Sequence, residues 1–155
     1  MAGSPIGRPW DRPPIPTRAN KSASALYEAI GRALEAWENV EVSLSSLYAA
    51  LTGRARFNRA AYREYGEPLN FSGRKRLLEQ AAERYFIQHP CQTTEGDFQS
   101  LMESVTGYAE RRNDIAHGIV TALHMARNKH ATILGDGSPL HWCLVPPRFK
   151  ETKHS

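Results

Sequence analysis

Hydrophobic positions recur with helical spacing over three long stretches of the chain. Between residues 22 and 52 the apolar side chains follow one helix face, and Thr52-Gly53 ends the pattern. Residues 72–88 and 95–117 show the same 3.6-residue period. We therefore predict three long helices, the first two antiparallel to each other. The predicted core contains Trp37, Leu44, Leu78, Phe86, Leu101 and Val105.

The predicted helix ends carry residues that are typical of helix boundaries. Pro68 and Ser72 mark the start of the second helix. Thr94 and Asp97, three residues apart, have the form of a capping box for the third. Gly118 directly follows that helix, so we expect it to adopt the left-handed conformation that often stops a helix.

The hydrophobic pattern changes after residue 118. Segments 119–123, 131–134 and 140–145 read as short strands, and 135–139 reads as a turn. Residues 1–20 hold five of the ten prolines, so we expect a disordered arm there. The predicted organisation is mainly α: an arm over 1–20, a helical core over 21–118, and a short β-hairpin or meander with a basic tail over 119–155.

Composition narrows the class of protein. A chain of 155 residues with net charge +4 fits one domain that is mildly basic, as suits a polyanion partner. There is no signal-like N-terminal run and no apolar stretch of about 18 residues, so we expect a cytoplasmic protein that does not enter membranes. The sequence contains no P-loop, GxGxxG, GxSxG or HExxH pattern, and we predict no cofactor.

Two His-x-Cys pairs raise the alternative of a zinc site. They are His89 with Cys91 and His141 with Cys143, which include both cysteines of the chain. Paired zinc ligands are usually separated by at least two residues, so we predict no metal site. Two cysteines are also too few for a disulfide framework.

The end of the third predicted helix departs from its own apolar pattern. Continuing the stripe places Arg112 on the apolar face, where an unpaired guanidinium is costly. Asn113 precedes His117 by four residues, so its amide is placed to orient the imidazole. The alternative is that Arg112 and His117 only satisfy the last carbonyls of the helix. Three carboxylates lie near the stripe of the first helix, and one of them is a candidate partner for Arg112: Glu35, Glu38 or Glu41. The alternative, which is favoured for any single one, is a solvated carboxylate on the flank of the helix.

The run Arg112-Asn113-x-x-x-His117 resembles the R-x4-H signature of the HEPN superfamily, including the polar residue after the arginine. The resemblance covers roughly residues 21–118. It implies an antiparallel helical bundle, usually dimeric and often a metal-independent endoribonuclease, with Arg112, Asn113 and His117 as catalytic residues. It also implies a further bundle helix after the motif, which we expect this chain to lack because strand-like sequence follows instead.

The predicted function is cleavage of RNA by attack of its own 2′-hydroxyl on the adjacent phosphate. His117 is the expected acid–base and Arg112 the phosphate clamp, with a second copy completing the site in a homodimer. A toxin or defence role is expected, with a protein antitoxin as a further partner. HEPN toxins neutralised by a nucleotidyltransferase carry Tyr two residues after the histidine, where this chain has Ile119. The alternative function is a non-catalytic module of the same fold that binds nucleic acid or protein.

Basic residues outside the motif are candidates for contacts with RNA phosphates. Three follow Gly73 at a predicted helix N-terminus, where free amides also favour phosphate. Residues 54–66 interleave arginines with aromatic residues, which suits single-stranded nucleic acid. The alternative is a solvated basic face whose aromatic rings lie in the core. The candidate phosphate contacts are Arg111, Arg74, Lys75, Arg76 and Arg59.

Overall fold

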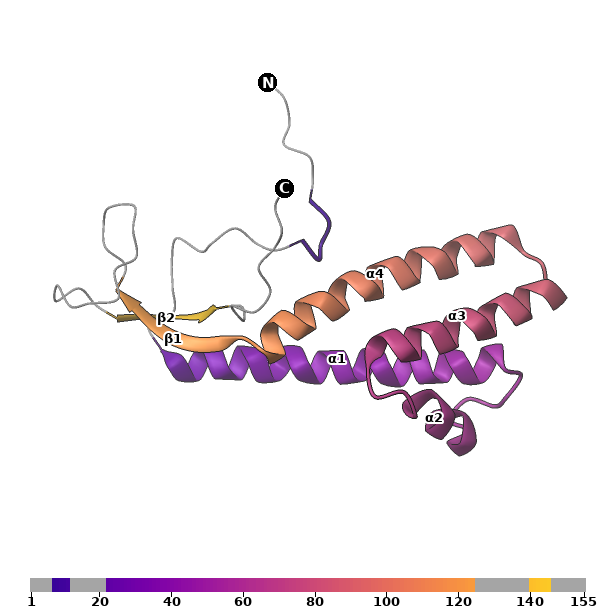
Figure 1. Ribbon diagram of the computed structural model, residues 1–155, viewed down its shortest axis with the longest axis horizontal. Helices are drawn as coiled ribbons and strands as arrows, with labels where there is room; N and C mark the ends of the chain where they lie inside the picture. The colour runs from indigo at the N-terminus through magenta and orange to yellow at the C-terminus, as the bar shows by residue number, and fades with distance from the viewer. Residues whose placement is uncertain (1–6, 12–21, 125–139, 146–155) are drawn as a thin grey trace, which may run out of the picture. The chain divides into compact units, whose positions relative to one another are not determined.

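The computed structural model describes residues 7–11, 22–124 and 140–145. Within these ranges the elements are α1 (Ala23–Leu51), α2 (Arg59–Gly66), α3 (Phe71–Gln88), α4 (Gln92–Ala116), β1 (Ile119–His124) and β2 (Leu140–Val145) (Figure 1). The predicted mainly α fold with a short β-hairpin is confirmed. The strand and turn predicted over 131–139, most of the arm over 1–20 and the tail after 145 lie outside the described residues.

Internal contacts divide the chain into two units. Ala36–Ala109, here called the bundle unit, contains parts of α1 and α4 together with α2 and α3. Met1–Glu35 together with Glu110–Ser155, here called the hairpin unit, contains the Arg112 motif and both strands. No helix in the described ranges is long and apolar enough to cross a membrane.

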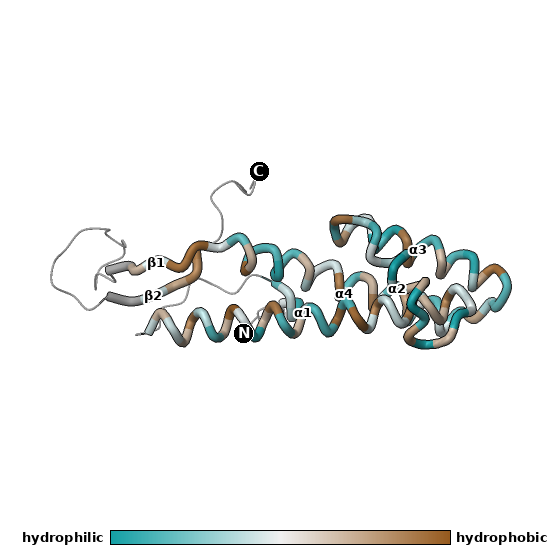
Figure 2. The backbone as a smooth tube through the Cα atoms, turned by 90° about the horizontal axis from the view of Figure 1, so that it is seen from below, coloured by the Kyte–Doolittle hydropathy of each residue, from teal (hydrophilic) through white to brown (hydrophobic). Residues whose placement is uncertain are grey.

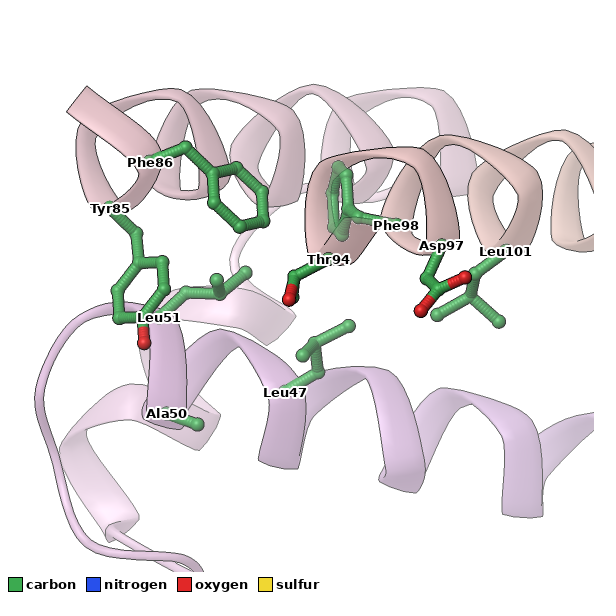
Figure 3. Close-up of a pocket in the computed structure, with 9 residues that line it drawn as sticks. All are labelled: Leu47, Ala50, Leu51, Tyr85, Phe86, Thr94, Asp97, Phe98 and Leu101. Atoms are coloured by element: carbon green, nitrogen blue, oxygen red, sulfur yellow. The ribbon is translucent and has the colours of Figure 1, made fainter. Parts of the chain in front are cut away.

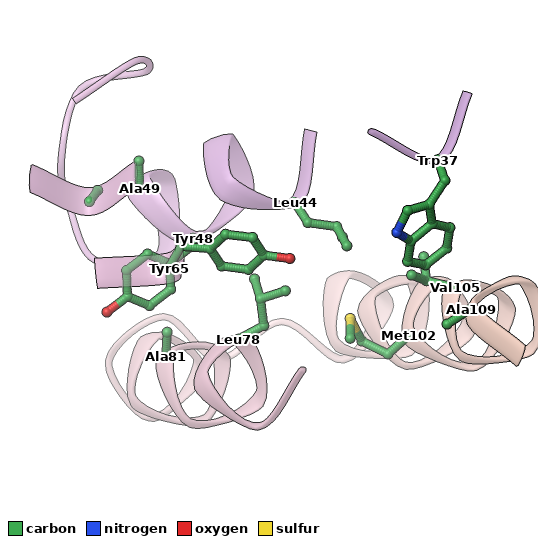
Figure 4. Close-up of a cluster of buried hydrophobic side chains, with 11 residues drawn as sticks. Trp37, Leu44, Tyr48, Ala49, Tyr65, Leu78, Ala81, Met102, Val105 and Ala109 are labelled. Carbon is green, nitrogen blue, oxygen red and sulfur yellow. The ribbon is translucent and has the colours of Figure 1, made fainter. Parts of the chain in front are cut away.

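A buried apolar cluster joins the four helices of the bundle unit. Leu78 is fully buried, and Figure 4 shows Trp37 of α1 pointing toward Val105 and Ala109 of α4. Burying one leucine side chain contributes about 2 kcal/mol, so a cluster of this size accounts for a stable bundle. Its members are Trp37, Leu44, Tyr48, Ala49, Ala61, Tyr65, Leu78, Ala81, Met102, Val105 and Ala109.

The core prediction was wrong for two of its six residues. Leu101 is 42% exposed, and Phe86 is half-buried with its ring centroid 6.1 Å from that of Phe98. Both side chains line a pocket between α1, α3 and α4, because the helices do not close over the stripe at that end of the bundle unit. The other four residues are buried as predicted: Trp37, Leu44, Leu78 and Val105.

Helices α1 and α3 run in the same direction, which corrects the prediction that they are antiparallel. The rings of Trp37 and Phe71 are 5.3 Å apart, so α3 begins beside the middle of α1. Leu51 and Tyr85, near the ends of the two helices, line the same pocket. The connection through α2 returns the chain before α3 starts, and α4 then runs antiparallel to both (Figure 1).

Side-chain caps set the ends of the first three helices. Ser22 Oγ accepts from the α1 amide of Ala25 at 3.4 Å, and Gly53, with φ of 69°, ends that helix. Asn58 caps α2. Asn70 caps α3, where Pro68 and Ser72 had been expected to mark the start. An asparagine amide oxygen satisfies an amide that the helix itself leaves free.

The start of α4 differs from the predicted capping box. The helix begins at Gln92, so Thr94 lies inside its first turn and does not cap it. The Thr94 hydroxyl donates instead to the sulfur of Cys91 at 3.2 Å, and this hydrogen bond lowers the pKa of the exposed thiol. The backbone amide of Glu95 bonds to the Cys91 carbonyl, which closes the first turn.

The two strands form an antiparallel hairpin. Ile119 pairs with Val145 at one end and His124 with Leu140 at the other. Apolar residues are concentrated where β1 begins and β2 ends (Figure 2). Two of the three predicted strands are thereby confirmed, and they pair with each other.

Gly118 joins α4 to β1 through close packing, not through a left-handed conformation. Among the described glycines only Gly53 has a positive φ, so the predicted left-handed stop at Gly118 was wrong. A Cβ at Gly118 would lie 2.6 Å from Leu144 Cδ1 and 2.8 Å from the carbonyl oxygen of Asp114. The hairpin thus approaches the helix end too closely for any side chain at this position.

Candidate functional site at the end of helix α4

The motif residues occupy the last two turns of α4 and the residue that follows. Arg112 and Asn113 are half-buried in the helix, whereas His117 is exposed just beyond it. The His117 amide donates to the Asn113 carbonyl at 3.0 Å, which fixes the backbone while the imidazole stays in solvent. An accessible imidazole is what proton exchange with an external substrate requires.

Arg112 uses few of its five donors. Its Nη1 donates to Asn113 Oδ1 at 3.2 Å, and no further hydrogen bond or ion pair of Arg112 occurs among the described residues. Its Nε is buried and has no acceptor there. Leaving a buried donor unsatisfied costs about 1–3 kcal/mol, so such a group calls for a reason. No ion pair of Arg112 with a carboxylate occurs among the described residues, and Glu41, one of its three candidate partners, pairs with Arg74.

Asn113 orients the arginine, not the histidine. Its side-chain oxygen accepts from Arg112, and no hydrogen bond joins the side chains of Asn113 and His117 in the part of the chain that the structure describes. The prediction that Asn113 orients the His117 imidazole is therefore wrong for this structure, in which Asn113 contacts the Arg112 guanidinium. This contact restrains Arg112 without neutralising its charge.

Arg111, the neighbouring cation, is neutralised within its own helix. Its Nη1 lies 2.8 Å from Asp114 Oδ2, at an angle outside hydrogen-bond geometry, and its Nη2 lies 3.5 Å from Glu110 Oε2. The Nε of Arg111 is buried without an acceptor among the described residues. A phosphate contact by Arg111 stays a prediction, and it would compete with the Asp114 carboxylate.

Arg74 was a candidate for phosphate binding, but its donors point into the bundle unit. Its Nη2 and Nε donate to the two carboxylate oxygens of Glu41 at 2.8 and 3.1 Å, and its Nη1 donates to the Pro68 carbonyl at 3.0 Å. The Tyr65 hydroxyl donates to the same carboxylate at 2.8 Å. Burial opposes the charge of Arg74, but its hydrogen bonds to the Glu41 carboxylate and the attraction between the two charges raise its pKa. Burial, followed by the contact with Glu41, raises the pKa of Tyr65.

The start of α3 already uses the Gly73 amide and packs closely around Gly73. The Gly73 amide already donates to Asn70 at 2.8 Å, and a Cβ at Gly73 would lie 2.7 Å from the Pro68 ring. Lys75 Nζ lies 3.6 Å from Glu79 Oε1 on the same helix. Of the three cations predicted here, only Arg76 is exposed with no ion pair among the described residues.

A second and more exposed ion pair joins α2 to the segment that follows α1. Arg54 Nη1 donates to Glu64 Oε2 at 2.6 Å. Burial, followed by the hydrogen bond and the charge of Glu64, raises the pKa of Tyr48 to about 12. Hydrogen bonds from Tyr48 and Arg54 lower the pKa of Glu64. The sequence did not reveal either ion pair, because the partners are separated by 10 to 33 residues.

The apolar pocket of the bundle unit has a volume of about 320 Å³. Figure 3 shows rings of Tyr85, Phe86 and Phe98 around it, with the polar groups of Thr94 and Asp97 at one side. Both polar residues are exposed, so the pocket has few fixed polar contacts. Its chemistry does not match that of the Arg112 motif, which lies in the hairpin unit.

The structure distinguishes one residue within the basic and aromatic stretch 54–66. Phe57, between α1 and α2, has a φ of 67° and is 63% exposed. The available signal was an aromatic residue beside an arginine, directly before the helix cap Asn58. Arg59, predicted to contact phosphate, is exposed at the start of the adjacent α2.

Within the described ranges, no three His, Cys, Asp or Glu side chains are grouped so that they hold a metal ion. No protein-family model, curated protein or solved structure matches this chain. The candidate site consists of the four predicted residues that lie at the end of α4 or directly after it, namely Arg111, Arg112, Asn113 and His117. The other predicted phosphate contacts belong to the bundle unit.

Proposed function

We propose that the protein is a metal-independent endoribonuclease whose active site lies at the C-terminal end of α4. The observation that carries the proposal is the state of Arg112, a half-buried guanidinium with unused donors, restrained by Asn113 and followed by an exposed His117. A restrained cation without a carboxylate partner is suited to a phosphate. The resemblance to the HEPN motif points to the same residues.

In the proposed reaction the 2′-oxygen of RNA attacks the adjacent phosphorus and the 5′-oxygen leaves. The products are a 2′,3′-cyclic phosphate and a 5′-hydroxyl. A base must accept the 2′-hydroxyl proton, an acid must protonate the leaving oxygen, and a cation must stabilise the charge on the transition-state phosphate. His117 exchanges the protons, Arg112 binds the phosphate, and Asn113 holds Arg112 in place.

One chain supplies a single motif histidine, whereas the reaction uses both an acid and a base. A symmetric pair of chains supplies two of each motif residue, and two-fold pairing is the commonest oligomer symmetry. The proposed active form is therefore a homodimer. Light scattering at tens of micromolar protein should give about twice the mass of the 155-residue chain, and a monomer only would argue against a shared site.

The test is incubation of the purified protein with total RNA, with and without a chelator. Cleavage should persist with chelator and should fall about 10²–10⁴-fold in His117→Ala, as expected for loss of a general acid–base group. His89→Ala is the matched control, since His89 is also an exposed histidine at a helix C-terminus. Arg112→Lys should also be impaired, because an ammonium does not reproduce the planar guanidinium.

Three outcomes would contradict the proposal. They are full cleavage by His117→Ala, a requirement for one divalent ion, and RNA binding without cleavage by the unaltered chain. The last outcome would instead establish the non-catalytic binding module. A role as a toxin or defence component is part of the same proposal, and it requires that expression of the unaltered chain, but not of His117→Ala, arrests growth.

A further inference from the structure

The connection between α1 and α2 presents an aromatic ring to solvent. Phe57 is 63% exposed, although a phenylalanine gains most when it is buried. Its φ of 67° is in the left-handed region, which is unfavourable for a bulky side chain. Strained backbone of this kind occurs preferentially at binding sites, because function compensates for the strain. The ring is thus held outward at a cost in conformational energy.

The neighbours of Phe57 restrain the ring without covering it. The Arg56 guanidinium lies 4.9 Å from the ring centroid, within the range of a cation–π contact. The Tyr62 ring centroid lies 6.3 Å away, and the Tyr62 hydroxyl shares a hydrogen bond of 2.7 Å with Ser46. Tyr62 is thereby fixed to α1, and Phe57 packs against a positioned partner.

Unpaired positive charge lies on the adjacent helix. Arg59 and Arg63 are exposed on α2, four residues apart and therefore on one face. Neither makes a hydrogen bond or ion pair with any residue in the described ranges, whereas Arg54 in the same segment is paired with Glu64. Like charges at this spacing disfavour the helix, and contact with an anionic partner would offset their repulsion.

We propose that Arg56, Phe57, Arg59 and Arg63, together called the Phe57 platform, bind single-stranded RNA. A base stacks on the Phe57 ring, and the flanking phosphates contact Arg59 and Arg63. Duplex RNA is excluded because its base faces are already stacked inside the helix. The inference deepens the proposed function, on which the choice of RNA as ligand rests, by specifying a single-stranded substrate.

The experiment measures fluorescence anisotropy of a labelled 12-nucleotide 2′-O-methyl RNA with the full chain. This probe lacks the 2′-hydroxyl nucleophile, so binding is measured without cleavage. Phe57→Leu keeps an apolar side chain but removes the stacking face, and it should weaken binding roughly 5- to 100-fold. Phe57→Tyr, which keeps the stacking face, should bind within about twofold of the unaltered chain.

The dependence of RNA affinity on salt concentration distinguishes base stacking on Phe57 from phosphate contacts by Arg59 and Arg63. The double variant Arg59→Ala/Arg63→Ala should reduce the slope of log affinity against log salt by about 1.4, because two phosphate contacts are lost. Phe57→Leu should leave that slope unchanged. Arg32→Ala/Arg84→Ala is the matched control, since it removes two exposed arginines from other helices and should preserve both slope and affinity. Circular dichroism of each variant checks that the helices remain folded.

The proposal is overturned if Phe57→Leu binds as tightly as the unaltered chain, or if a duplex of the same sequence binds equally well. Weak binding by Phe57→Tyr would overturn it too. The two proposals fail separately. If the protein cleaves natural RNA but Phe57→Leu does not weaken binding of the probe, only the proposal of the Phe57 platform is contradicted. If Phe57→Leu weakens binding of the probe but the protein does not cleave natural RNA, only the proposal of a ribonuclease is contradicted.

Discussion

Two partly buried arginines, one in each unit, have opposite environments. In the bundle unit, Arg74 gives three donors to Glu41 and the Pro68 carbonyl. In the hairpin unit, Arg112 gives one hydrogen bond to Asn113 and leaves a buried Nε without an acceptor among the described residues. A guanidinium whose donors are all used inside the protein supports the fold. One whose donors are unused remains available to an external anion.

The difference extends to the surroundings of each arginine. The bundle unit contains a second ion pair, in which Arg54 Nη1 donates to Glu64. At the end of α4, Arg111 also has a buried Nε without an acceptor in the described part of the chain, despite its ion pair with Asp114. Within the described residues, the buried polar side-chain atoms without a hydrogen-bond partner all belong to Arg111 and Arg112.

The largest predicted effect comes from removing the partner of Arg74. Glu41→Gln leaves a partly buried cation without its counter-charge, and we expect the free energy of unfolding to fall by about 3 kcal/mol, the low end for a buried pair because Arg74 is 21% exposed. Arg112→Met removes a cation that lacks a carboxylate, so its cost should be below about 1 kcal/mol, since the unsatisfied Nε disappears. Urea unfolding of both variants gives the comparison. Equal losses would show that Arg112 is as structural as Arg74.

Glycines in the two units allow a smaller test of how tightly each is packed. Gly118→Ala and Gly73→Ala both place a Cβ within 3.0 Å of fixed atoms, and each should cost about 1–3 kcal/mol. Gly96→Ala is the control, because its Cβ would meet nothing within 4 Å. It lies inside α4, where alanine should stabilise by about 1 kcal/mol. Thermal unfolding monitored by circular dichroism measures all three, and a stabilised Gly118→Ala would refute the close approach of β2.

The smallest effect concerns acid pH and the second ion pair of the bundle unit. Hydrogen bonds from Tyr48 and Arg54 lower the pKa of Glu64 below its unfolded value of about 4.3. The stabilisation is therefore present above that pH and is lost as pH falls through the lowered folded pKa. Because the Glu64 side chain is 42% exposed, the loss should be below about 1 kcal/mol. Urea unfolding between pH 7 and 3 should show less acid sensitivity in Glu64→Gln, and equal sensitivity would remove Glu64 as the cause.

The sequence determined the helices, the hairpin strands and most of the core. The 3.6-residue period is a local property, and it located α1, α3 and α4 to within a few residues. Short apolar runs bounded by turn residues did the same for β1 and β2. The sequence also identified Arg112 as misplaced on an apolar face, and the structure shows it half-buried with an unsatisfied donor.

Only the tertiary structure decided which polar groups meet. Glu41 was one of three candidate partners for Arg112, but it pairs with Arg74, because α3 starts beside the middle of α1 and brings position 74 to that carboxylate. Periodicity gives the face on which a residue lies but not the direction of the neighbouring helix, and direction decides the partner. The requirement for Gly118 likewise depends on Leu144, 26 positions away, whose approach no local pattern reveals.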